Sequence, residues 1–136
     1  MRYLLDVNVM VAWGWADHPH HKKVDKWITE QMAPGSMIFH TSSIIELGFV
    51  RVSMQRSLGK VSIAQAVAVL TRQRERFVDR ISLLPDDLSS CREFPDWCTH
   101  AKHTTDSHLL ALAQKHNLQL ATLDTGIPGA FVIPEF

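Results

Sequence analysis

Short apolar runs alternate along the chain with longer segments in which apolar residues recur every three or four positions. Short runs bounded by turn residues are typical of buried strands, and the longer spacing is typical of amphipathic helices. We expect strands over residues 3–5, 37–40, 81–84, 118–123 and 130–133. We expect helices over residues 9–15, 20–32, 43–53, 63–79 and 105–116.

Turn-forming and capping residues mark the ends of several of these elements. Pro34-Gly35 stops the second helix, and Thr105 is expected to cap the last one. Residues 86–103 are polar and irregular, and a short helix is expected near residues 86–92. The chain is therefore expected to carry one long loop before its last helix.

The positions of the apolar residues predict which side of each helix is buried. The stripe expected on the helix over 63–79 consists of Ile63, Val67, Leu70 and Phe77. The residues expected to point inward from the last helix are Leu109, Leu112 and Ala113. Trp13 and Trp27 occupy apolar helical positions, which favours core packing over base stacking. Residues 9–15 are apolar on all sides, which fits a buried helix or a protein interface.

The alternation of strands with helices predicts the fold class. Strands separated by helical segments require crossover connections, which join parallel strands with a right-handed turn. We therefore expect a three-layer α/β/α domain with a central parallel sheet of four or five strands. At 136 residues the chain is expected to form a single domain over residues 1–136, with one core.

The overall composition is that of an ordinary globular protein, with 46% hydrophobic and 21% charged residues. Fourteen basic and fourteen acidic residues cancel, so no global field recruits nucleic acid, although a local patch still can. Such a patch is possible between Arg51 and Arg80, a segment that contains seven basic residues and only two acidic ones. A solvated helix face explains most of these basic residues equally well.

The sequence contains no sign of export or of membrane insertion. The N-terminus lacks the apolar core of a signal peptide, and no apolar stretch reaches the length of a membrane span. Two cysteines, Cys91 and Cys98, do not form a disulfide framework. We therefore expect a cytoplasmic protein without a membrane partner.

Four acidic residues lie just after strands or at the start of the helices that follow them. Asp6 follows the first strand, and Asp124 follows the fourth. Glu46 and Asp106 lie in the first turns of two expected helices. Because the functional crevice of an open parallel sheet lies beyond the carboxyl ends of its strands, we expect the four to converge.

Each acid also has a local explanation. Asp6 can cap the first helix, Ser43-x-x-Glu46 matches a capping box, Asp106 suits a helix dipole, and Asp124 suits a turn. Taken together, four converging carboxylates repel one another and require cations. Oxygen ligands favour Mg²⁺ or Mn²⁺, and such ions support phosphodiester hydrolysis.

At these residues the sequence resembles PIN domains, and specifically the VapC-type ribonuclease toxins of type II toxin–antitoxin systems. The matching segments follow the order of the family and cover nearly the whole chain: 4–9, 41–52, 105–113 and 120–124. The turn over residues 17–21 also resembles a subgroup of these toxins.

This resemblance implies a hydrolase, namely a Mg²⁺- or Mn²⁺-dependent endoribonuclease that cuts tRNA or ribosomal RNA. The implied catalytic residues and metal ligands are Asp6, Glu46, Asp106 and Asp124. The implied substrate-binding or supporting residues are Asn8, Arg51, Thr122 and Thr105. It also implies a homodimer and a cognate antitoxin whose C-terminal segment blocks the active-site groove.

Three alternatives compete with this interpretation. The spacing of the histidines and cysteines between Cys91 and His103 does not match a usual zinc site. An aspartyl-phosphate phosphatase requires a second acid where Asn8 stands and a lysine near Asp124, and neither is present. A non-catalytic PIN-like module that binds RNA or protein is disfavoured because all four acids are retained.

Overall fold

A five-stranded parallel sheet forms the centre of the computed structural model, which describes residues 2–32, 38–76 and 79–135. The strands are β1 (Arg2–Leu5), β2 (Ile38–Ser42), β3 (Ile81–Leu84), β4 (Gln119–Thr122) and β5 (Phe131–Val132). Their order across the sheet is β3-β2-β1-β4-β5, and every adjacent pair is parallel. The predicted α/β class is confirmed.

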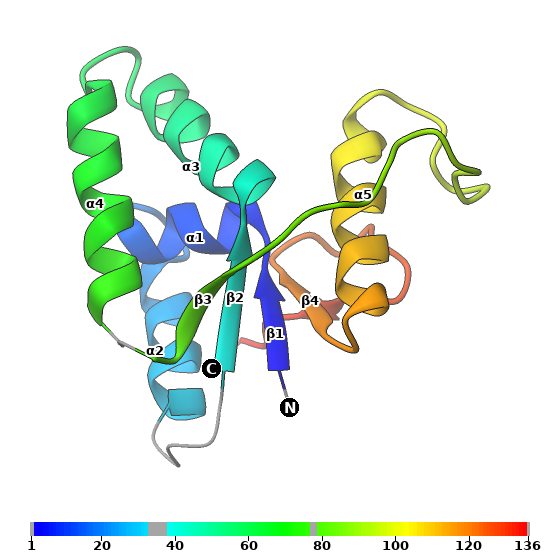
Figure 1. Cartoon of the computed structure of the whole chain (residues 1–136). Helices are drawn as coiled ribbons and strands as arrows, with labels where there is room; N and C mark the ends of the chain where they lie inside the picture. The colour runs from blue at the N-terminus through cyan, green and yellow to red at the C-terminus, as the bar shows by residue number, and fades with distance from the viewer. Residues whose placement is uncertain (1, 33–37, 77–78, 136) are drawn as a thin grey trace.

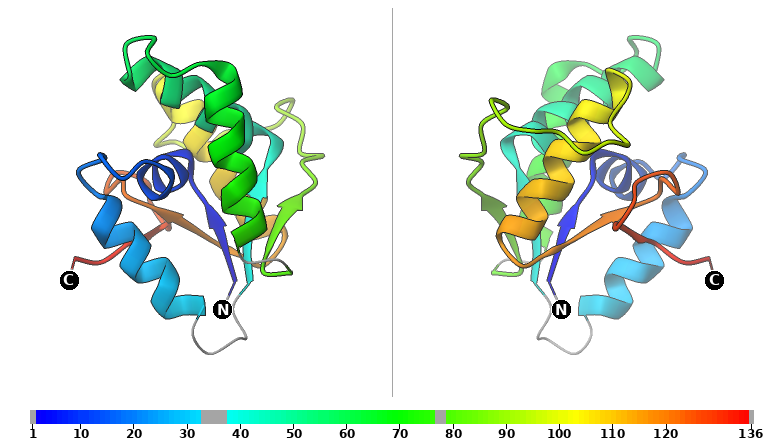
Figure 2. Two further views of the ribbon diagram at one scale, coloured as in Figure 1. Left: turned by 90° about the vertical axis from the view of Figure 1, so that its left-hand side faces the viewer. Right: turned by 90° about the vertical axis from the view of Figure 1, so that its right-hand side faces the viewer.

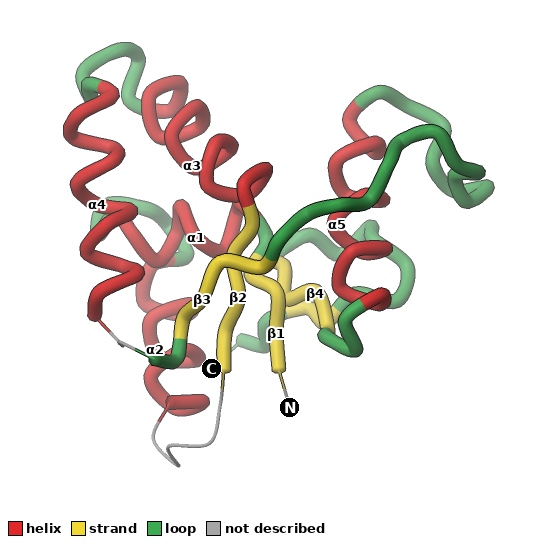
Figure 3. The backbone as a smooth tube through the Cα atoms, viewed as in Figure 1, coloured by secondary structure: helices red, strands yellow, loops and turns green. Residues whose placement is uncertain are grey.

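Within the described residues, five helices cover the two faces of the sheet. They are α1 (Val7–Gly14), α2 (His21–Met32), α3 (Ser43–Arg56), α4 (Ile63–Arg76) and α5 (Lys102–Lys115). Figure 1 shows α5 standing apart from the other four helices across the sheet, and the views of Figure 2 agree. Between β3 and α5 the chain crosses the molecule as the long predicted loop, drawn in green in Figure 3.

The central strand β1 is buried on both faces of the sheet, which explains why its last residues are apolar. Leu4 and Leu5 of β1 are fully buried, as expected for a parallel strand covered by helices on both sides. Trp27 of α2 packs edge-on against Tyr3 with ring centroids 5.0 Å apart, and it also contacts Phe39. Trp13 and Trp27 are buried, which confirms the prediction of core packing.

The apolar stripe predicted for α4 is partly wrong. Leu70 is buried, but Ile63 is 61% exposed and Val67 is 44% exposed. The helix instead turns Val69 and Gln73 inward, and Gln73 Nε2 donates to the carbonyl of Met10 at 2.8 Å. A buried glutamine on this face was not expected, because the hydrogen-bond acceptor comes from a distant helix.

Local hydrogen bonding shifts several predicted boundaries. The helix expected near residues 86–92 does not form, and Asp86 Oδ1 instead accepts the Leu88 N–H in a turn. Helix α5 begins at Lys102 rather than at Thr105, because backbone bonds from His103 and Thr104 continue the turn before it. The Pro34-Gly35 stop, the first residue of the strand expected over 37–40 and Phe77 lie outside the described residues.

No helix in the described segments combines the length and apolar character that crossing a bilayer requires.

Candidate active site at the carboxyl edge of the sheet

Three of the four predicted acids lie at the carboxyl edge of the two central strands. Asp6 follows β1 directly, and Asp124 lies two residues beyond β4, which pairs with β1 through Leu5 and Ala121. Asp106 lies in the N-terminal half of α5, which packs on the same two strands. The charges of Asp106 and Asp124 both act on Asp6, so the three carboxylates share one electrostatic environment.

Asp6 is the most buried of these acids, with 4% of its surface exposed. It caps α1, because its Oδ1 accepts the Val7 N–H at 2.7 Å, and its Oδ2 accepts the Thr122 hydroxyl at 2.7 Å. Burial raises the pKa of Asp6 to about 6, the two hydrogen bonds oppose this rise, and repulsion from Asp106 and Asp124 adds to it. The surroundings of Asp6 thus disfavour the negative charge of its carboxylate.

A small hydrogen-bond network fixes Asp6 relative to β4. Thr122 is fully buried, and its hydroxyl oxygen accepts the Asp124 N–H at 3.0 Å while the hydroxyl donates to Asp6. Asn8 Nδ2 donates to the same hydroxyl oxygen at 3.2 Å, and Asn8 Oδ1 accepts the Leu123 N–H at 3.1 Å. Asn8 and Thr122 therefore position the acids, and Thr122 lies too deep to contact a substrate.

Asp106 and Asp124 are more accessible. Burial raises the pKa of Asp106, Asp124 adds to that rise, and the charges of His103 and Lys102 oppose it. Asp124 is exposed, and its Oδ1 accepts the Gly126 N–H at 2.7 Å. Asp124 therefore forms a turn, as its local sequence predicted, and also lies at the carboxyl edge of the sheet.

Glu46 on α3 has a different environment from the three aspartates. Its Oε2 lies 3.4 Å from Nη1 of Arg74 on α4, and burial raises its pKa while Arg74 opposes the rise. The capping-box explanation is wrong, because Ser42 rather than Ser43 caps α3, through the Ile45 N–H. This shift by one residue leaves Glu46 free of any capping role.

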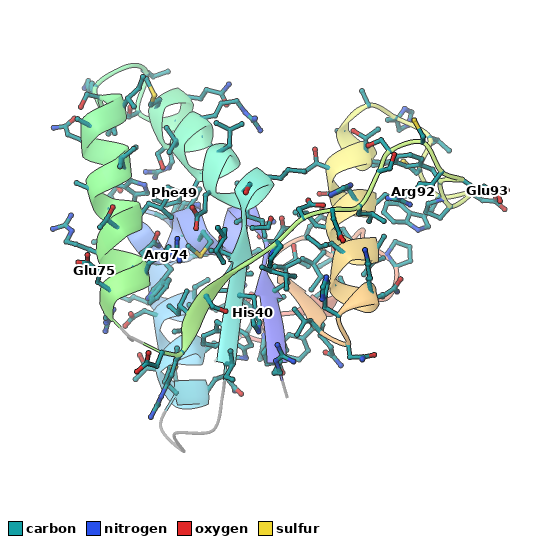
Figure 4. The ribbon with its side chains drawn as sticks, viewed as in Figure 1. His40, Phe49, Arg74, Glu75, Arg92 and Glu93 are labelled. Atoms are coloured by element: carbon teal, nitrogen blue, oxygen red, sulfur yellow. The ribbon has the colours of Figure 1, made fainter. Side chains whose placement is uncertain are left out.

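Arg74 was not singled out from the sequence. It belongs to the run of basic residues that a solvated helix face explains, and Figure 4 shows it on the inner side of α4, with Glu75 on the outer side. Only the packing of α4 against α3 brings its guanidinium to Glu46.

Comparison with known proteins identifies the fold family. The family model described as "PIN domain" matches residues 3–130. The chain belongs to the PIN-domain family. Among curated proteins of Mycobacterium tuberculosis, it is 33% identical to ribonuclease VapC39 over 93% of this chain and 91% of that protein. It is 35% identical to ribonuclease VapC38 over 91% of this chain and 86% of that protein. The predicted resemblance to VapC ribonucleases is confirmed.

Two solved PIN-domain structures share the fold at low sequence identity. M. tuberculosis VapC20, described as a sarcin-ricin loop cleaving toxin, superposes with a TM-score of 0.63 at 15% identity, covering 97% of this chain and 99% of that one. Rickettsia felis VapBC2, bound to a DNA fragment from its promoter, superposes with a TM-score of 0.58 at 17% identity, covering 96% of each.

The acids of this PIN domain fit a hydrated divalent cation. Within the described ranges, no three His, Cys, Asp or Glu side chains stand as a ready-made metal cluster. Mg²⁺, however, keeps several of its waters and needs only one or two carboxylates. The donors are all oxygen atoms, and Asp6 is repelled by two other aspartates. A cation at this edge would relieve that repulsion.

Proposed function

We propose that this PIN domain is the endoribonuclease toxin of a toxin–antitoxin pair and hydrolyses RNA phosphodiester bonds with Mg²⁺ or Mn²⁺. The observation that carries the proposal is the buried carboxylate of Asp6, held by two hydrogen bonds against the charges of Asp106 and Asp124. Its relatives VapC39 and VapC38 are named as ribonucleases, which supports the same activity here.

Different residues of this chain have different roles in the proposed site. Asp6, Asp106 and Asp124 would hold the cation, which supplies neutralisation of the phosphodiester and acidification of a water. Thr122 and the Val7 N–H keep Asp6 from rotating. Arg74 opposes the protonation of Glu46, so that Glu46 remains an acceptor on the α3 side of the edge.

Residues outside the acid edge are proposed to bind RNA. Arg51 is exposed on α3, about one and a half helical turns beyond Glu46. Its positively charged guanidinium could bind a phosphate of the RNA backbone. Arg56, another residue of the basic run, forms an ion pair with Asp17 at 3.3 Å, so part of its charge is already neutralised. We propose a structured RNA such as tRNA or ribosomal RNA as the substrate.

The proposed function includes two protein partners. The superposed VapBC2 structure contains a toxin with its antitoxin partner, which supports a cognate antitoxin for this chain. A homodimer is proposed on the family resemblance.

The decisive experiment replaces Asp106 by asparagine. Asp106→Asn should abolish cleavage of total RNA in Mg²⁺ or Mn²⁺, because the edge loses a charge that binds the cation, while circular dichroism shows an unchanged fold. Asp25→Asn on α2, which removes an acid from a surface ion pair with Arg76, is the matched control and should cleave normally. Full activity of Asp106→Asn, or of the natural protein in excess EDTA, would refute a metal-dependent site at these acids, whereas a natural protein that binds RNA without cleaving it would favour a non-catalytic binding module.

A further inference from the structure

A cavity of about 380 Å³ opens beside the acid edge, between the first turns of α3 and α5. Ser43, which lines it, begins the helix that carries Glu46. Thr105, which also lines it, directly precedes Asp106. The cavity therefore lies against the first turns of the two helices that carry Glu46 and Asp106, where a nucleotide flanking a phosphate bound at the acids could reach it.

A buried hydrogen-bonded pair forms one side of the cavity. Asp86, which follows β3, accepts a hydrogen bond from His108 Nε2 on α5 at 2.6 Å, and both side chains are only 9% exposed. The other oxygen of Asp86 accepts the Leu88 N–H at 3.2 Å. Each carboxylate oxygen thus has one partner and retains capacity for another, and the orientation of the group is fixed.

The hydrogen-bonded pair of Asp86 and His108 is expected to add little to the stability of the fold. Burying two polar groups costs desolvation free energy that their attraction barely repays, and apolar residues would pack equally well there. Asp86 is also an acid that follows a strand of the sheet, separate from the three aspartates proposed to hold the cation. Its placement in the wall of a cavity points to a ligand.

The remaining walls fit a flat heterocycle. Ile44, Leu88 and Phe94 provide apolar surface, while hydroxyl groups come from residues such as Ser90 and Thr104. Apolar walls with a few fixed polar groups are typical of small-molecule sites. Bases that leave the stack are read in the same way, by stacking and by hydrogen bonds to their edges. A phosphate would be repelled by the Asp86 carboxylate.

We propose that this cavity receives the base of a nucleotide next to the scissile phosphate, and that Asp86 accepts a hydrogen bond from the base's amino group. The inference rests on the proposed ribonuclease function and names the feature of RNA that the site reads. Adenine, cytosine and guanine carry such an amino group, and carboxylates accept from amino groups of this kind. Uracil carries none and is expected to be disfavoured at this position.

The first test fills the cavity. Cleavage of a randomised single-stranded RNA pool in Mn²⁺ is mapped by sequencing for the natural chain and for Ile44→Trp. The natural chain should disfavour uracil at one position beside the cut, and Ile44→Trp should lose this preference and raise KM about tenfold, the value of one lost hydrogen bond to a charged group. The matched control is Ile63→Trp on α4, which makes the same substitution at an isoleucine that is 61% exposed. This variant should keep the base preference and the KM of the natural chain.

The second test changes the hydrogen-bonding character of the pair. Asp86→Asn replaces an acceptor with an amide that also donates, so cleavage beside uracil should rise relative to cleavage beside the other bases. A merely structural role would lower cleavage equally at all bases, and that result would overturn the proposal.

A binding measurement separates this inference from the proposed function. In the Asp106→Asn background, a short RNA with the fluorescent base 2-aminopurine is titrated into variants with and without Ile44→Trp. Weaker binding with Ile44→Trp supports the cavity even if no variant cleaves RNA, a result that would refute only the ribonuclease function. Active protein whose base preference survives Ile44→Trp refutes the cavity and leaves the ribonuclease function standing.

Discussion

At the scale of single residues, Asp6 shows how one side chain serves both structure and chemistry. Its Oδ1 caps α1, and its Oδ2 is held by Thr122. A carboxylate is not needed for the cap, because asparagine caps a helix equally well. The negative charge therefore costs folding free energy, since burial and two other aspartates oppose it.

This cost predicts a pH-dependent effect of Asp6→Asn. The pKa of Asp6 is about 6 in the folded chain and about 3.9 in an unfolded one. The folded state binds the proton more tightly, so stability is greatest below the lower value and falls as pH rises to about 6. In EDTA, Asp6→Asn should be more stable than the natural chain by about 3 kcal/mol at about pH 8 and nearly equal at about pH 4. Urea unfolding at both pH values measures this, and a pH-independent difference would contradict it.

At the scale of elements, a close contact between α1 and α3 sets the geometry behind the acids. Gly48 of α3 faces Val7 of α1, and a Cβ on Gly48 would lie 2.8 Å from Val7 Cγ2. Val7 is the residue whose N–H binds Asp6. The separation of these two helices therefore bears directly on the position of the Asp6 carboxylate.

Gly48→Ala should consequently destabilise the fold. Alanine improves helix propensity by about 1 kcal/mol, but overpacking against a stiff valine costs about 1–3 kcal/mol, so a net loss is expected. The urea midpoints of Gly48→Ala, Val7→Ala and the double variant form a double-mutant cycle. The smaller side chain at residue 7 should recover most of the loss, and strictly additive effects would rule out the contact as its cause.

At the scale of the whole molecule, the strands and helices together bring like charges to one edge, so folding and cation binding are linked. A ligand that binds only the folded state stabilises it, by about 2.7 kcal/mol at one hundred times its dissociation constant. Because metal ligation requires ionised carboxylates, protons compete with the cation as pH falls toward the pKa of Asp6, about 6.

Saturating Mn²⁺ should therefore raise the melting temperature at about pH 8, and the rise should shrink below about pH 6. Differential scanning calorimetry measures both effects. Asp25→Asn should retain the full rise, whereas Asp6→Asn should lose most of it. An equal rise in the two variants would show that Mn²⁺ binds away from the carboxyl edge.

Much of the architecture follows from the sequence because its signals are local. Apolar runs and helical spacing predicted the parallel α/β sheet, and strand ends indicated where Asp6 and Asp124 lie. Helix starts were less predictable, because neighbouring hydroxyl groups compete for one cap, as Ser42 and Ser43 do at α3. That competition decides whether Glu46 serves the helix or the site.

The sequence by itself determined the order of the elements and the α/β class, because apolar runs, helical spacing and turn residues are signals between residues close together in the chain. The residues predicted to point inward from α5, Leu109, Leu112 and Ala113, are all buried, whereas only the tertiary structure decided which face of α4 packs inward. The rotation of α4 exposes Ile63 and brings Arg74 to Glu46, and the packing of the loop after β3 against α5 joins His108 to Asp86. Helix rotation is set by shape and hydrogen bonding between distant segments, which the spacing of apolar residues along one helix does not encode.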